Sequence, residues 1–458
     1  MKRAIRNIRN WGKNLFNSSI KYRYIDLIFP AILAALFIFV LLIKKNSIIC
    51  IICLLIIFLF NLTRLKFWIL LLLFFAIIFL SYAVYQAIFN QYNNLGIEGI
   101  FSLKANYKNS FIFKKDNINF QINKDILKEK FLFLDNQINQ IHNFYIKGKL
   151  VKLNNLSDFN FSNQIFFYSN ITNIKYVDSY PTFSISNSKN PVVNEYLNLI
   201  ILNKFNRNSL VYQKLSNLNI LHLFTISGFH FNLIYLFVNS LLKNKKRLSL
   251  LADFIGISLL IIYLVILDFK ISATRSILFI LLIFINKNIF NSKLENTTLL
   301  AICAFIIAAI NPYLIFSYSY ILSFSITLVI LISVLLFRNY NFYWKTIFLL
   351  VLAHIYATLI THTFNENYNV FSFFIQLLLI PIISFNYIFS LLFFKLTFLV
   401  ERTIIILDTF LDLLQDSSVF IKFSISTELC ILFFIPLFIL RKMEIENLYK
   451  KFYEFRSS

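Results

Sequence analysis

The sequence predicts an α-helical polytopic membrane protein of about 11 spans, each near 20 residues, with one β domain inserted outside the membrane. Hydrophobic residues make up 59% of the 458 positions and charged residues only 14%. Soluble domains are about 45–50% apolar and about 25% charged, so that class is excluded. The apolar residues form blocks near the length of a spanning helix, and the only long polar stretch runs from about residue 90 to 195.

Positive charge marks the N-terminal end of the chain. The formal net charge is +23, from 44 Lys and Arg against 21 Asp and Glu. Basic residues precede the first apolar block with no acid among them: Lys2, Arg3, Arg6, Arg9, Lys13, Lys21 and Arg23. Positive residues are enriched on the cytoplasmic side, so residues 1–23 are predicted to be a basic cytoplasmic N-terminus. Blocks at 24–43, 47–60 and 65–87 predict three transmembrane helices within residues 24–89, which leave the following segment outside.

The polar stretch 90–195 contains patterns typical of strands. Residues 117–123 alternate between polar and apolar, and 144–153, 164–168 and 171–176 are aromatic and β-branched runs. Period-two patterns predict short strands, here enough for a small barrel or sandwich. Basic and aromatic side chains interleave, as on surfaces that bind a single nucleic-acid strand. The candidate receiving residues are Phe144, Tyr145, Lys147 and Lys149. An ordinary half-buried sheet with solvated lysines is the alternative.

Apolar blocks resume at residue 220 and fill the rest of the chain. They predict spans near 220–242, 248–268, 272–290, 297–311, 318–337, 346–363, 371–392 and 420–440. Basic residues at 243–247 follow an inward crossing, which agrees with the positive-inside bias. Either residues 403–414 cross the membrane, or the run 371–400 contains two short spans broken at Pro381. Residues 404–415 could equally lie flat in the interface. Arg441 and Lys442 favour a cytoplasmic tail at 441–458.

Two groups of polar residues lie within the apolar blocks, where such residues usually face a cavity or another helix. The first is His222, Ser227, Gly228, His230 and Asn232, and the second is His354, Thr358 and His362. On one continuous helix His222 and His230 would share a broad face, as the second group would by its spacing of four. Gly228 would let a neighbouring helix approach closely.

The spacing of these groups leaves three interpretations open. Helix packing is the first, and a path for protons or a transition metal is the second, since imidazoles titrate near neutrality and bind metals. The third is an intramembrane serine hydrolase that uses Ser227 and His230, although no third residue orients the histidine. No acid lies within either group, and the six glycines lack the spacing of a P-loop. The sequence therefore predicts no catalytic residue, no cofactor and no metal site.

The run His222-Leu223-Phe224-Thr225-Ile226-Ser227-Gly228-Phe229-His230 resembles the His-Leu-Leu-Ala-Ile-Ser-Gly-Leu-His signature of ComEC-type competence proteins. Those proteins are bacterial inner-membrane channels that import single-stranded DNA. Segments 271–276, 311–324 and 373–385 resemble later family segments in the same order. The resemblance covers about residues 195–440. Ile321 stands where the family usually has Gln, and the sequence lacks the His-x-His-x-Asp-His cluster of the nuclease domain that many members carry.

The resemblance implies an OB-like extracytoplasmic domain at 90–195 and a competence-type channel domain at 196–440, in a bacterial cytoplasmic membrane. It implies a DNA translocation path, not an enzyme, and adds Arg275, Asn311, Pro312 and Ser323 to the two polar groups as path residues. The expected partners are single-stranded DNA, membrane lipid, a cytosolic ATPase or strand-binding proteins, and a separate nuclease. No oligomeric state is predicted. The alternatives are a His-lined transporter of a metal ion or small solute, and a degenerate family member without transport activity.

Overall fold

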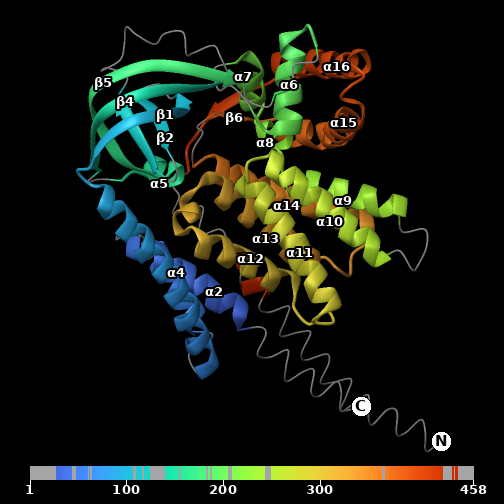
Figure 1. Cartoon of the computed structure of the whole chain (residues 1–458). Coiled ribbons are helices and arrows are strands. Elements are labelled where there is room, and N and C mark those ends of the chain that lie inside the picture. The colour runs from blue at the N-terminus through green and yellow to red at the C-terminus, as the bar shows by residue number, and fades with distance from the viewer. Residues whose placement is uncertain are drawn as a thin grey trace, which may run out of the picture.

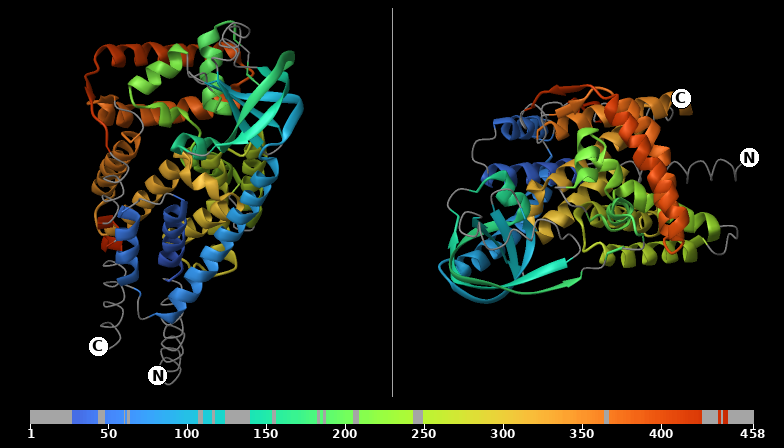
Figure 2. Two further views of the ribbon diagram at one scale, coloured as in Figure 1. Left: turned by 90° about the vertical axis from the view of Figure 1, so that its left-hand side faces the viewer. Right: turned by 90° about the horizontal axis from the view of Figure 1, so that it is seen from above.

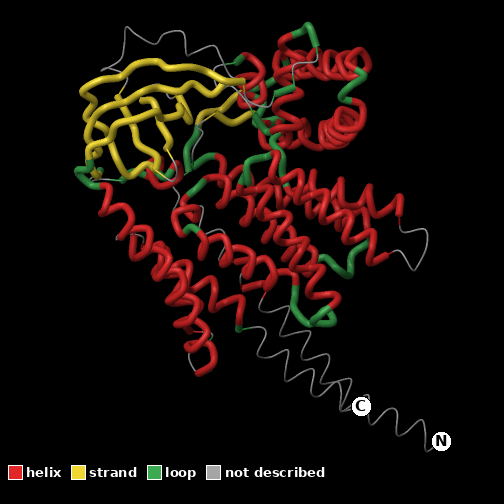
Figure 3. The backbone as a smooth tube through the Cα atoms, in the orientation of Figure 1, coloured by secondary structure: helices red, strands yellow, loops and turns green. Residues whose placement is uncertain are grey.

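The computed structural model is largely helical, with a β-barrel in one corner (Figures 1 and 3). It describes residues 27–43, 48–59, 61, 64–106, 110–115, 118–123, 140–153, 156–181, 184–185, 188–204, 209–242, 249–363, 367–425, 436–437 and 439–441. The predicted basic N-terminus 1–23, the loop 243–247, most of the predicted span 420–440 and the tail after residue 441 lie outside the described residues.

The N-terminal helices are α2 (Ile28–Ile43), α3 (Ile48–Leu59) and α4 (Leu65–Tyr92). They are apolar on all sides, as expected of helices surrounded by lipid or protein. Phe29 and Ile32 of α2 form a buried cluster with Ala301 of a later helix, and Phe74 of α4 packs on Phe305 with ring centroids 4.8 Å apart. The N-terminal helices therefore pack directly against the second helical region.

The barrel strands are β1 (Gly96–Asn106), β2 (Ser110–Lys115), β3 (Ile118–Asn123), β4 (Gln140–Lys152) and β5 (Ile165–Pro181). They close in the order β1-β2-β3-β5-β4, with β3 and β5 parallel and the other pairs antiparallel. A small closed five-stranded barrel is the architecture of an OB-fold. The predicted strand runs all fall in β3, β4 and β5, and the last two runs merge into β5. Helix α5 (Asp158–Asn163) precedes β5.

Alternation along β4 decides which predicted receiving residues reach solvent. Phe144 is 1% exposed and packs on Phe113 inside the barrel, with ring centroids 5.4 Å apart. The prediction that Phe144 receives DNA is therefore wrong, because successive side chains of a strand point to opposite faces. Lys147 and Lys149 are exposed and Tyr145 is half-exposed. Gly148 lies at a register shift, where a Cβ atom would be 2.5 Å from the carbonyl oxygen of Asn170.

The second helical region contains α9 (Gly228–Leu242), α10 (Ser249–Ile266), α11 (Ile271–Asn288), α12 (Asn296–Ile310), η4 (Pro312–Phe316), α13 (Tyr318–Leu336) and α14 (Phe342–Thr361). Within the described residues, six helical segments are long and apolar enough to span a membrane: Leu65–Tyr92, Leu221–Leu241, Ile271–Asn288, Tyr318–Leu336, Phe342–Thr361 and Ser372–Phe393. Shorter apolar helices include α2, α6, α10 and α12. The figure of about 11 spans, at roughly 20 residues each, stays a prediction.

Beside the barrel lies an outer layer of helices (Figure 2). Its members are α6 (Pro191–Leu202), α7 (Leu210–Asn217), α8 (Leu221–Phe224), α15 (Ser372–Phe393) and α16 (Thr397–Asp416). Helices α15 and α16 lie crosswise to α2 and α4, although α15 is long enough to span. The direction of α16 favours the interfacial interpretation of residues 404–415. The sequence predicts that residues 420–422 begin the last span, and this is wrong. Their backbone instead pairs as strand β7 (Phe420–Lys422) with strand β6 (Asn367–Asn369).

Aromatic contacts fix the barrel to the helices beneath it. Phe89 near the end of α4 stacks on Phe166 of β5 at 4.3 Å, and Phe166 packs on Tyr313 of η4 at 4.6 Å. Gln86 Nε2 donates a hydrogen bond of 2.7 Å to the Tyr313 hydroxyl. The barrel and the helical region therefore share one hydrophobic core.

Candidate functional site

The polar run 222–230 is divided between two helices. Helix α8 ends at Phe224 and α9 begins at Gly228, with extended backbone at Thr225. The prediction that His222 and His230 share one helical face is therefore wrong, since the 100° step per residue does not continue through the break. A hydrogen bond of 2.9 Å from the Ser272 hydroxyl to the Ile226 carbonyl ties the break to α11. The break turns the two histidines toward different neighbours.

The side chain of His230 caps the N-terminal end of α9. Its Nδ1 atom accepts a hydrogen bond of 3.1 Å from the backbone N–H of Ser227, and the Ser227 hydroxyl lies 3.2 Å from the same nitrogen. A side chain three residues into a helix that accepts from the N-cap N–H acts as in a capping box. The imidazole also packs against the rings of Tyr387 and Phe229, with ring centroids 4.5 and 5.8 Å apart. No carboxylate within the described ranges contacts His230, so this arrangement does not supply the third group that a serine hydrolase needs.

Arg275 lies against the N-terminal end of α9. Its side chain belongs to α11 and is 6% exposed. Nη1 donates 2.5 Å to the Thr327 hydroxyl of α13, and Nη2 donates 3.1 Å to the Ser276 hydroxyl. A Cβ atom added at Gly228 would overlap Arg275 Nη2. Gly228 is therefore the residue that lets the guanidinium occupy this position, and we call Gly228, Arg275, Ser276 and Thr327 the arginine cluster.

The arginine cluster carries a positive charge that the described residues do not balance. All its hydrogen bonds go to neutral hydroxyls, and Nε makes none within the described part of the chain. An unpaired charge at membrane depth is costly, by several kcal/mol after relaxation. A site with this arrangement favours an anion, and the positive end of the α9 helix dipole adds to that preference.

A second cluster forms around His222. It lies close enough to His354 of α14 for the two imidazoles to influence each other electrostatically. His354 Nδ1 lies 3.1 Å from Oε1 of Gln376 on α15, and the Thr358 hydroxyl lies 3.4 Å from His354 Nε2. We call His222, His354, Thr358 and Gln376 the histidine cluster. It joins three helices and contains no acid.

The structure places the other predicted path residues in several different surroundings. His362 directly follows α14, its backbone N–H donates 3.0 Å to the Thr358 carbonyl, and its ring stacks on Phe423 with ring centroids 4.2 Å apart. Asn232 is exposed on α9. Asn311 caps η4 by accepting 3.1 Å from the Tyr313 N–H, so Asn311 and Pro312 shape the support of the barrel rather than the polar clusters. Ser323 contributes its carbonyl, which accepts 2.8 Å from the Thr327 hydroxyl.

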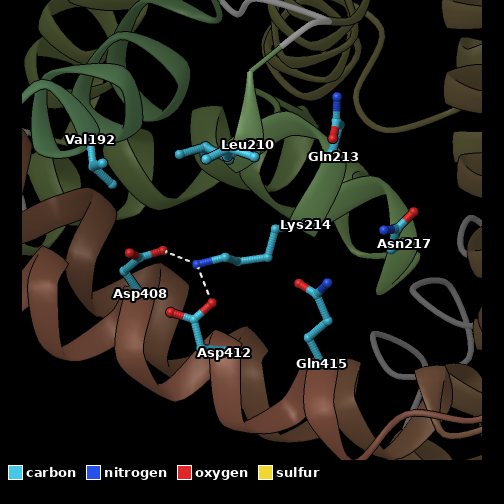
Figure 4. Close-up of a pocket in the computed structure, with 9 residues that line it drawn as sticks. Val192, Leu210, Gln213, Lys214, Asn217, Asp408, Asp412 and Gln415 are labelled. Carbon is cyan, nitrogen blue, oxygen red and sulfur yellow. Dashed lines mark hydrogen bonds and ion pairs between the residues drawn. The ribbon is translucent and has the colours of Figure 1, made fainter.

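A cavity of about 410 Å³ lies in the outer layer of helices (Figure 4). The charge of Lys214, which lines this cavity, is balanced by carboxylates. Lys214 of α7 forms ion pairs of 2.6 Å with both Asp408 and Asp412 of α16. Asp408 also accepts 2.7 Å from the Tyr196 hydroxyl. Burial opposes the charge on Lys214, but the two carboxylates outweigh it and raise the pKa of Lys214. This group joins α6 and α7 to α16, and no sequence motif indicated it.

Sequence reasoning missed the partners that orient the predicted residues. Thr327, Gln376 and Tyr387 are polar side chains within largely apolar helices, and that placement is a signal because such residues usually face another helix or a cavity. Their partners come from other helices, which the sequence does not reveal. Among the described residues, no group of three His, Cys, Asp or Glu side chains is placed to hold a metal ion.

Comparison with known proteins identifies the family of this chain. The model of the competence protein family matches residues 200–440, more than half of the chain. An uncharacterized protein of Mycoplasma genitalium, MG316, is 31% identical over 198 residues, which are 43% of this chain and 50% of that protein. Its homolog in Mycoplasma pneumoniae is 29% identical over 202 residues, with the same coverage. The chain thus spans about half the length of the curated relatives it matches. No solved structure matches it.

Proposed function

Because the chain belongs to the competence protein family, we propose that it conducts single-stranded DNA across the bacterial cytoplasmic membrane during transformation. The observation that carries this proposal is the arginine cluster, a buried cation held by hydroxyls alone beneath the start of α9. A DNA strand bears a phosphate charge at every nucleotide, so it needs a polar or positive route through hydrocarbon.

The proposed division of the chain follows from the sequence. Residues 1–23 form the cytoplasmic N-terminus, 24–89 the N-terminal helices, 90–195 the external domain, 196–440 the channel domain and 441–458 a cytoplasmic tail. About 11 crossings of roughly 20 residues each complete the topology. The barrel then stands outside the membrane, where it first meets the strand. Tyr145, Lys147 and Lys149 are its receiving residues.

Ion pairing modifies the proposed receiving surface. The Lys147 ammonium forms an ion pair of 2.9 Å with Glu98 on β1, and the Tyr145 hydroxyl donates to the same carboxylate. These two hydrogen bonds lower the pKa of Glu98, so its negative charge persists at neutral pH. Lys147 therefore attracts a phosphate less than Lys149 does.

Force and strand degradation come from partners in this proposal. The glycines of the chain lack P-loop spacing, so a cytosolic ATPase or strand-binding proteins would pull the strand. A separate nuclease would remove the other strand. Anionic lipid would bind the basic cytoplasmic segment, at about 1 kcal/mol per Lys or Arg.

A His-lined transporter of a metal ion or small solute is the second candidate, and the histidine cluster is the observation that favours it. Neutral imidazoles bind transition metals. Cellular metal content in a strain that lacks this protein separates the two candidates. A changed metal content with normal DNA uptake would establish the transporter and refute the channel.

The direct test is uptake of labelled DNA by a competent strain that depends on this protein. Arg275→Met keeps the length of the side chain and removes its charge, and we expect uptake to fall at least tenfold. Arg275→Lys should retain part of the uptake, because a cation remains. Lys287→Met, which removes an exposed cation near the other end of α11, is the matched control. Equal uptake by the parent and Arg275→Met, at equal protein levels, would contradict the assigned path and favour a family member without transport activity.

A further inference from the structure

Helices α15 and α16 follow each other in the sequence and form a helical hairpin, joined by residues 394–396. Between them lies an apolar groove of about 340 Å³, a volume within the range of small-molecule sites. Its walls are Ile382 and Phe385 of α15, with Ile406, Leu407 and Phe410 of α16. The described residues that line the groove include no charged side chain, so it offers nothing to a phosphate.

Asn386 brings an unsatisfied acceptor to this groove, which its side chain also lines. The residue is 4% exposed, and its Nδ2 donates 3.0 Å to the Ile382 carbonyl one turn earlier. Its Oδ1 makes no hydrogen bond within the described part of the chain. A buried acceptor without a donor costs free energy. The groove therefore favours an apolar ligand that also donates one hydrogen bond.

The outward side of the hairpin is apolar next to the groove. Six exposed residues follow it, and we call them the hairpin face: Phe374, Phe385 and Leu392 on α15, with Leu399, Ile406 and Leu413 on α16. Their spacings of seven or eleven residues place them on nearly one side of each helix. A long exposed apolar face marks a contact with a membrane or with another protein.

The direction of the helices indicates which of these contacts the face makes. Figure 2 shows α15 and α16 crosswise to α4, and α4 is long and apolar enough to span a membrane. The hairpin therefore runs along the plane of a membrane that α4 crosses. The acids of α16 use another side of the helix, where Asp408 and Asp412 pair with Lys214. An apolar face apart from a charged side is typical of interfacial helices.

We infer that the α15–α16 hairpin lies in the membrane surface, and that its groove holds the acyl chain of a lipid whose free glycerol hydroxyl donates to Asn386 Oδ1. This inference adds a lipid site to the proposed function. In this placement α15 does not cross the membrane, although its length would allow it. The groove has room for a chain but not for a partner helix, which is about 10–12 Å wide with its side chains.

The test uses the full chain in nanodiscs and two photoreactive probes. One is a monoacylglycerol with a diazirine at the end of its acyl chain, and the other is the same lipid with both hydroxyls methylated. Cross-linked peptides are identified by mass spectrometry. We expect both probes to label residues 382–410, and the hydroxyl probe to label them about fivefold more, as one hydrogen bond allows.

Two variants separate the acceptor from the groove itself. Asn386→Leu removes the acceptor and keeps an apolar wall, so the two probes should label it equally. Ile406→Trp covers the groove from an exposed position, so labelling by both probes should fall about tenfold. Ile405→Trp is the matched control, because Ile405 is the next residue of α16 and does not line the groove. It should be labelled as the parent is.

Four outcomes would overturn the inference while leaving the uptake test of Arg275 unaffected. The first is a parent that neither probe labels within residues 382–410. The second is a preference for the hydroxyl probe that survives in Asn386→Leu. The third is labelling that a single-stranded oligonucleotide suppresses and unlabelled lipid does not, which would assign the groove to the strand. The fourth is cross-linking of the hairpin to a second copy of the chain in place of lipid.

Discussion

Lys214 and Arg275 are both cations held among helices, but their surroundings differ. Lys214 lies between two carboxylates at 2.6 Å, whereas within the described residues the Arg275 guanidinium donates its hydrogen bonds to hydroxyls alone. A cation with matched acids joins parts of a protein and has no charge left for a ligand. A buried cation without them reduces stability unless an anion compensates it. The difference separates a structural group in the outer layer from a candidate DNA path.

The largest expected effect comes from removing each of these two cations in turn. Lys214→Met leaves Asp408 and Asp412 facing each other without a cation, so thermal unfolding should occur several degrees lower. Arg275→Met removes an unbalanced charge, so its unfolding temperature should equal or exceed that of the parent. DNA uptake should show the reverse order, with the greater loss in Arg275→Met. Melting curves of both purified variants check this, and equal destabilisation would remove the distinction.

A smaller effect is expected at Gly228. Alanine there meets Arg275 Nη2 and, at 3.0 Å, the Ser276 hydroxyl, so Gly228→Ala should reduce stability by about 1–3 kcal/mol, the cost of overpacking. In an Arg275→Ser background the added methyl group has room, so the penalty should be smaller. A double-mutant cycle measures this coupling. Additive effects would show that the two residues do not touch.

The pH dependence of strand binding tests whether Lys104 of β1 takes part in receiving the strand. Desolvation, followed by repulsion from Lys114 and Lys270, lowers the pKa of Lys104 to about 8. It is charged below that pH, so binding should weaken as the pH rises through about 8, while lysines near their usual pKa of about 10.4 remain charged. Lys104→Arg should abolish that part of the dependence. A parental pH profile identical to that of Lys104→Arg would show that Lys104 takes no part.

The smallest effect is expected at the helix cap. His230→Gln retains an acceptor for the Ser227 N–H and should leave stability within about 0.5 kcal/mol, whereas His230→Leu should lose about 1 kcal/mol, typical of a lost cap. Denaturant titration measures both. Parental uptake by His230→Gln would support a structural role, and complete loss of uptake at unchanged stability would require a chemical one.

The sequence predicts local elements well and long-range contacts poorly. Alternation predicts β3, β4 and β5, since burial of one face imposes a period of two. It does not show which of Phe144 and Tyr145 faces outward. Ser227 and Gly228 before an apolar run are a helix-start signal, and they could have indicated the break between α8 and α9. Apolar blocks predict the long helices, but β7 shows that an apolar run can also pair as a strand.

The clusters depend on contacts between residues far apart in the sequence. Arg275 meets Gly228 and Thr327, which belong to two other helices. No periodicity records such contacts. The ordered resemblance to competence proteins identified Arg275 and the run 222–230, and the structure supplies the reason that they belong together.

The most direct test of the DNA path is the ionic current through the purified protein in a planar bilayer. With single-stranded DNA added on the barrel side, we predict an anion-selective current that the strand blocks. Arg275→Met should lose both the selectivity and the block, while Arg275→Lys keeps them in part. A parental current that single-stranded DNA does not affect, or an equal block in Arg275→Met, would contradict the account.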